Sequence, residues 1–94
     1  TIAGKVNVSS KTFTVTVQGP SSVTKVKMEA TLYQKKLIGR EEISTMSASS
    51  NSARCSKSQS AAIEKGKTYV IEVTAQVYSG GAWDTIEETT TVKT

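Results

Sequence analysis

The chain has 94 residues, a formal net charge of +4, a single cysteine and no histidine. This length corresponds to one domain, residues 1–94, which can bury a modest core without a metal or a disulfide. The absence of histidine excludes Ser-His-Asp and Cys-His catalytic arrangements, and one cysteine alone cannot build a structural zinc site. We therefore expect no enzyme activity and no cofactor.

The charge is distributed unevenly along the sequence. Residues 1–40 hold seven Lys or Arg against Glu29 alone, whereas residues 82–94 hold three acidic residues against one lysine. A basic half suits anionic partners, but it is also a common way to keep a surface solvated. Nucleic acid binding needs a basic groove interleaved with aromatics, and Glu29 interrupts the face of Lys25, Lys27 and Tyr33. We expect no nucleic-acid partner.

The apolar residues recur with a period of two, which is typical of half-buried strands. With 13 serines and 14 threonines, the composition indicates an all-β protein with a hydroxyl-rich surface. The expected strands span 2–8, 11–18, 23–34, 37–46, 53–63, 67–78 and 83–93, with turns at 19–22 and 35–36 and a polar loop at 47–52. A bulge is expected at Gly39, and residues 61–65 have a short helix as their alternative. The inward positions of the clearest strands are Phe13, Val15, Val17, Val26, Met28, Ala30, Leu32, Tyr69, Ile71, Val73, Ala75 and Val77.

The last two strands are predicted to form a hairpin around Gly80-Gly81, since a two-residue turn of this kind requires positive φ. That register pairs Tyr78 with Trp83 on the polar face, and it places Ile86 and Val92 toward the core. It also points Glu88 inward, and we expect a bulge or an edge position to relieve this conflict.

The segment Ile63-x-x-Gly66-x-x-Tyr69-x-Ile71-x-Val73-x-Ala75 resembles the corner that leads into the sixth strand of fibronectin type III domains. Lys65 stands where that family has proline, and the tryptophan usual in an early strand is absent. The resemblance implies an immunoglobulin-like, fibronectin type III-like antiparallel β-sandwich of about seven strands, with the Tyr69 hydroxyl bonded to backbone at Ile63–Gly66. The Gly-Lys-Thr-Tyr strand and the Tyr-x-Gly-Gly-x-Trp hairpin also resemble small secreted β proteins of Gram-positive bacteria.

No residue pattern predicts catalysis. The neighbours Glu41-Glu42 and Glu87-Glu88 face opposite sides of a strand, so neither pair forms a carboxylate dyad. Cys55 lacks a base and is interpreted as a small half-buried hydrophobe. No acidic loop predicts a calcium site.

The function indicated is that of a non-enzymatic binding or structural domain, secreted or on a cell surface, monomeric, with a protein or glycan partner. The candidate partner-binding residues are Tyr78, Trp83, Tyr33, Lys25 and Lys27. One alternative is a carbohydrate-binding module that uses Tyr78 and Trp83, and another is a small basic effector or antimicrobial protein that acts on anionic envelopes. The aromatic pair is either a local brace or a contact surface, and its small area favours the brace. The first residue, Thr1, suggests a processed mature form or an excised domain.

Overall fold

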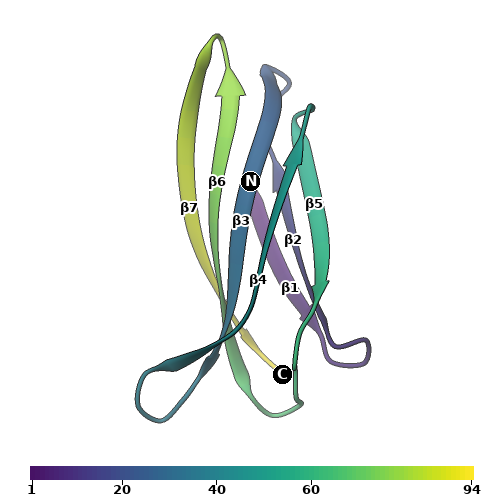
Figure 1. The fold of residues 1–94 in the computed structure, drawn as a ribbon, viewed down its shortest axis with the longest axis vertical. Helices are drawn as coiled ribbons and strands as arrows, with labels where there is room; N and C mark the ends of the chain where they lie inside the picture. Colours follow the sequence, from purple (N-terminus) through teal and green to yellow (C-terminus); the bar gives the residue numbers. More distant parts are fainter.

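The computed structural model describes all 94 residues and contains seven antiparallel strands in two facing sheets, without a helix (Figure 1). The strands are β1 (Ile2–Asn7), β2 (Thr12–Gln18), β3 (Val23–Lys35), β4 (Arg40–Ser50), β5 (Arg54–Ser60), β6 (Thr68–Ser79) and β7 (Ala82–Lys93). One sheet has the order β1-β2-β5 and the other the order β4-β3-β6-β7. The prediction of an all-β, seven-stranded antiparallel architecture is confirmed. No helix is long and apolar enough to cross a membrane.

The core lies between the two sheets and contains no charged side chain; its only polar groups are the hydroxyl of Tyr69 and the thiol of Cys55. The period-two pattern explains it, because every second side chain of β2, β3 and β6 points to the same face of its sheet. All twelve inward positions predicted for these strands are buried. The remaining buried residues are Val23 of β3, Met46 of β4, Cys55 of β5 and Ile63, which lies between β5 and β6.

The corner between β5 and β6 is closed by a buried tyrosine, as the sequence predicts. Tyr69 has no exposed surface, and the backbone N–H of Glu64 donates to its hydroxyl oxygen over 2.7 Å. Gly66 permits the turn with a φ of +86°. The Thr94 side chain accepts from the Lys67 N–H and donates toward the carbonyls of Glu64 and Lys67, so the last residue ties this corner to β7.

The region around β4 differs from the sequence prediction. The turn spans residues 36–39, not Lys35-Lys36, and Gly39 lies in it with a φ of +72°. The irregularity expected at Gly39 instead lies opposite the Leu32–Tyr33 step, where Ile43 is the extra residue of β4. The predicted 47–52 loop was wrong for its first four residues, which continue β4. Serine is a weak strand former, but hydrogen bonds from β3 hold this segment in the sheet.

The segment after β5 is shorter and less regular than expected. β5 ends at Ser60, and residues 61–65 form neither strand nor helix. Only Ile63 of this segment is fully buried, while Ala61 packs against the rim of the core. The segment therefore forms part of the corner that Tyr69 closes.

The edge position of β7 resolves the conflict at Glu88, whose carboxylate points inward in the predicted hairpin register. The pairs Tyr78–Trp83, Ala75–Ile86 and Tyr69–Val92 all form as predicted, without a bulge. β7 is an edge strand, so Glu88 is exposed even though it shares a face with the core residues of β6. The expected core position of Ile86 was wrong, since this side chain is 44% exposed. The three-stranded sheet contacts β7 little and leaves that part of its inner face open.

Candidate binding surface

The β6–β7 turn holds two aromatic side chains in a fixed arrangement. Gly80 and Gly81 have φ values of +58° and +85°, which suit the two central residues of a tight hairpin turn. Tyr78 and Trp83 are directly paired across the strands, with ring centroids 5.1 Å apart and planes tilted by 56°. This tilted geometry is favourable for aromatic rings and fixes the orientation of both.

Two lysines of β3 lie on the same outer face and contact these rings. The Lys25 ammonium is 5.6 Å from the centre of the Tyr78 ring, and the Lys27 ammonium is 4.9 Å from the centre of the Trp83 ring. Both distances fall within the range of cation–π attraction. We call Lys25, Lys27, Tyr78 and Trp83 the aromatic–lysine cluster. Trp83 remains 42% exposed within it.

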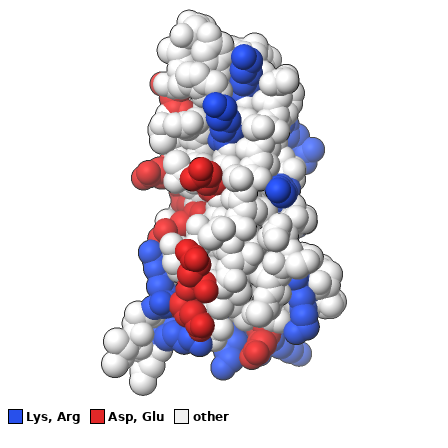
Figure 2. Space-filling model, in the orientation of Figure 1, with Lys and Arg blue, Asp and Glu red and all other residues white.

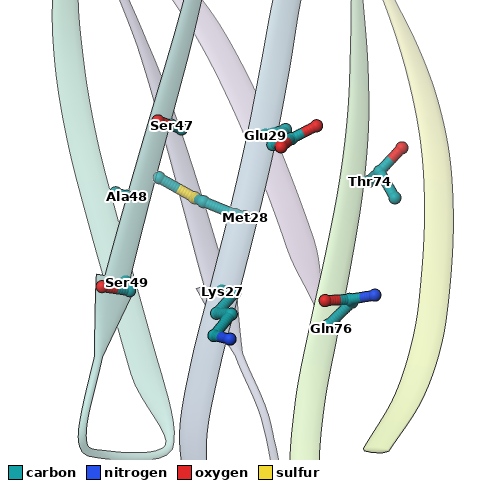
Figure 3. Close-up of a pocket in the computed structure, with 8 residues that line it drawn as sticks. All are labelled: Lys27, Met28, Glu29, Ser47, Ala48, Ser49, Thr74 and Gln76. Carbon is teal, nitrogen blue, oxygen red and sulfur yellow. The ribbon is translucent and has the colours of Figure 1, made fainter.

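A shallow groove of about 450 Å³ adjoins the cluster on the same sheet. It runs across β4, β3 and β6, and Figure 3 shows the side chains from these three strands. Lys27 belongs to both the groove and the cluster, whereas Glu29 lies one outward position further along β3. The rest of the polar lining consists of hydroxyl and amide groups, from Ser47, Ser49, Thr74 and Gln76. These groups donate and accept hydrogen bonds without adding charge.

The charges of this sheet form zones from one end to the other. Figure 2 looks onto the sheet and shows mostly basic side chains near the β6–β7 end, with an acidic one at the margin, mostly acidic ones in the middle, and basic ones with some acidic neighbours at the opposite end. The cluster contributes two of the cations at the first end, and Glu29 is the next ionised side chain along β3. An acidic group at the cluster therefore meets positive charge, and one in the middle of the sheet meets repulsion.

Tyr33 is not part of the cluster, although it shares its face. It lies eight residues from Lys25 along β3, which corresponds to about 26 Å. The Arg40 guanidinium stacks 4.0 Å from the centre of its ring and also pairs with Glu72 at 2.6 Å. Glu72 therefore pairs with Arg40 and with neither Lys25 nor Lys27. Arg40 instead joins β4, β3 and β6 at the far end of the sheet.

The titratable groups form no site of another kind. No group of three or more His, Cys, Asp or Glu side chains converges. Cys55 is a free, buried thiol. Burial raises the pKa of the Cys55 thiol, and the nearby Lys57 ammonium partly offsets this by favouring the thiolate. The thiol therefore stays protonated at neutral pH.

Sequence reasoning identified the four members of the cluster and the Tyr78–Trp83 pair, but not the contacts of the two lysines with the rings. The Tyr78–Trp83 pair follows from a local turn, whereas the Lys27–Trp83 contact depends on the pairing of β3 with β6, which is remote in sequence. The groove was also missed, because Thr74 and Gln76 belong to no distinctive motif and Ser47 and Ser49 were predicted to lie in a loop. Outward polar positions on three neighbouring strands were the only available signal.

No protein-family model, curated protein or solved structure matches this sequence.

Proposed function

We propose that the chain is an immunoglobulin-like sandwich of the fibronectin type III kind. The strand order supports this, because β1-β2-β5 corresponds to strands A, B and E and β3, β6 and β7 to strands C, F and G of immunoglobulin-like folds. The fourth strand pairs with the third, as strand C′ does in variable domains. The Tyr69 corner lies where such folds have their tyrosine corner. Its departures from the antibody domains are the missing disulfide and the position of its single tryptophan in the last strand.

We propose further that the domain acts by non-enzymatic binding, and that the aromatic–lysine cluster is its contact surface. The observation that carries this is the 42% exposure of Trp83, on the β6–β7 hairpin, beside two lysines of β3. Tryptophan and tyrosine supply large contact areas with few rotatable bonds, and both are enriched at binding hot spots. The lysines add positive charge next to this apolar surface. The favoured partner is an acidic segment of another protein.

A glycan is the second candidate partner, and the neighbouring groove favours it. Its hydroxyl and amide lining suits the many hydroxyls of a sugar, and the indole of Trp83 offers an aromatic face beside it. Lys27 occupies one side of that indole, which limits stacking to the other side. An acidic sugar fits this arrangement when its carboxylate lies at Lys27 and its hydroxyls lie in the groove, away from Glu29, which also lines the groove. This candidate makes the same surface a carbohydrate-binding site.

The position of Trp83 provides a direct test, because it is the only tryptophan in the chain. The protein is titrated with a glutamate-rich peptide, a uronic-acid oligosaccharide and a neutral oligosaccharide while tryptophan emission is recorded. We expect a saturable change with an acidic probe, weakened by salt and by Lys27→Gln. Arg54→Gln is the matched control, since Arg54 is an exposed cation of the other sheet. If no probe produces a saturable change, or if both variants behave alike, the proposed surface is wrong.

We also propose a secreted or cell-surface location. The resemblance to extracellular sandwich domains and to small secreted β proteins supports it, as does the hydroxyl-rich exterior. Fractionation of the native source, followed by detection of the chain with an antibody, tests this directly. Recovery in the cytoplasmic fraction alone would contradict it.

A further inference from the structure

The β3–β4 turn presents two aliphatic side chains that nothing in the fold covers. Leu37 and Ile38 are 102% and 91% exposed, whereas the next most exposed large hydrophobics are only half as exposed. The turn is ordered by a hydrogen bond, in which the N–H of Lys36 donates to the Gly39 carbonyl over 3.1 Å. In Figures 1 and 2 this turn projects from the lower left of the molecule as an uncharged tip.

Because Leu37 and Ile38 are almost fully exposed, their side chains add no packing to the fold. Turn positions commonly carry Gly, Asn, Asp, Ser or Pro, because these residues satisfy the backbone or adopt its special angles. A single exposed apolar residue needs no explanation, but two adjacent and fully exposed ones at a projecting tip form a surface that loses free energy in water. Burial of this surface by something outside the chain would recover that free energy.

Positive charge surrounds the tip. Lys35, Lys36 and Arg40 flank it directly in sequence. The β1–β2 turn and the β5–β6 connection lie at the same end of the sandwich and add further lysines (Figure 1). Residues 8–11, 35–42 and 61–67 together contain six cations and three glutamates, and the cations are Lys11, Lys35, Lys36, Arg40, Lys65 and Lys67.

Two of these cations have acidic neighbours but remain accessible. Lys36 lies 3.1 Å from Glu41, and Arg40 pairs with Glu72. All four side chains are at least 39% exposed, so these pairs are weak and screened by salt. An external anionic surface can compete for both cations.

We propose that this end of the sandwich docks on an anionic lipid bilayer, with Leu37 and Ile38 inserted at the boundary between headgroups and acyl chains. Exposed apolar residues above a collar of Lys and Arg are the combination that favours interfacial binding to anionic lipids. A bilayer also accepts a convex tip without a preformed pocket. The tip lies at the opposite end from the β6–β7 turn, so this inference does not depend on the aromatic–lysine cluster (Figure 1).

The expected binding is reversible and depends on both components. Complete burial of a leucine or isoleucine corresponds to at least about a tenfold gain in partition coefficient, and interfacial burial falls near that lower value. Each Lys or Arg near an anionic surface adds about fivefold. The two aliphatics and three flanking cations therefore give micromolar to millimolar lipid affinity that falls steeply as salt is added.

The test is co-sedimentation with vesicles made of equal parts phosphatidylglycerol and phosphatidylcholine, compared with phosphatidylcholine alone. We expect binding only to the anionic vesicles. The Leu37→Ser/Ile38→Ser double variant should lose about a hundredfold in partition coefficient, and Lys35→Gln about fivefold. The matched controls are Ile86→Ser, which removes an exposed aliphatic from β7, and Arg54→Gln, which removes a cation from the β4–β5 end; both should bind like the wild type.

Insertion is measured separately with Leu37→Trp in a Trp83→Phe background. Its emission should shift to the blue on anionic vesicles, because the indole leaves water. The proposal is overturned if anionic vesicles are not bound, if the serine variant binds like the wild type, or if the Leu37→Trp emission does not shift. It is also overturned if the serine substitutions only abolish self-association in size exclusion, since a second copy then covers the tip. Trp83→Ala should still bind vesicles, so failure of this proposal is distinguishable from failure of the cluster.

Discussion

Removal of the Tyr69 hydroxyl should weaken the corner that joins the two sheets. Tyr69→Phe keeps the ring, which has no exposed surface, but leaves the Glu64 N–H without its partner 2.7 Å away. This bond is part-buried and Glu64 itself is exposed, so the unpaired donor should cost about 1 kcal/mol, the lower end of the range for an unsatisfied polar group. For a domain of this size, each kcal/mol lowers the melting temperature by about 4–8 °C. We expect the urea midpoint to fall with an unchanged m-value, because the surface exposed on unfolding stays the same.

Tyr78→Phe is the matched control for this measurement. The Tyr78 ring lies on the outer face, and its hydroxyl makes no hydrogen bond within the chain, so the substitution should stay within about 0.5 kcal/mol of the wild type. Equal effects of the two substitutions would refute the reasoning. A Tyr69→Phe variant as stable as the wild type would show that the corner does not depend on the hydroxyl.

Three further perturbations test the remaining parts of the structure. Trp83→Ala should lower the free energy of unfolding by about 1–2 kcal/mol, because the contacts with Tyr78 and Lys27 are lost, and it should abolish ligand binding per folded molecule. A loss of stability with unchanged binding would mean that the aromatic pair only stabilises the hairpin. Gly81→Ala should cost about 1 kcal/mol because of its φ of +85°, and an unchanged melt would contradict the turn assignment. Cys55→Ala should leave a folded monomer, and its small deficit in stability should shrink as the pH rises past the usual thiol pKa. Burial raises the pKa of Cys55 in the folded state, so the protonated thiol stabilises the wild type only until the unfolded chain ionises; a deficit that is constant with pH would contradict this.

The local features of the fold could be predicted from the sequence because short-range patterns determine them. The alternation in β6 identified its buried face, and the glycine pair determined which residues of β6 and β7 stand opposite each other. The Tyr69 corner also lies within a few residues of its hydrogen-bond partner. Each of these features depends on residues that are neighbours in the chain.

The features that were wrong depend on the neighbouring strands. Ser47–Ser50 extends β4 because β3 supplies its hydrogen bonds, and no pattern in the serines indicates this. Ile86 has an inward position, yet its exposure follows from how far the other sheet reaches over β7. The turn at 36–39 was misplaced because Leu37 and Ile38 look like strand residues by composition. Their exposure became visible only in the structure.

The candidate surface was predictable to a similar extent. Tyr78 and Trp83 were identified as a pair from the turn, and Lys25 and Lys27 as outward residues from the alternation in β3. Tyr33 is also an outward residue of β3, but it lies far from the others along the strand, and the Arg40 guanidinium covers its ring. The period-two pattern gives the face of a side chain, whereas the distance between two side chains on one face depends on the pairing of strands.

The central claim is that ligands bind at the aromatic–lysine cluster, and mapping of backbone amide shifts by NMR tests it most directly. The protein is titrated with the glutamate-rich peptide and the uronic-acid oligosaccharide. We predict that saturable shifts concentrate on residues 25–27, 76–78 and 83–85, and that they disappear in Trp83→Ala while its remaining spectrum stays folded. Shifts confined to the β1-β2-β5 sheet, or unchanged shifts in the variant, would contradict the account.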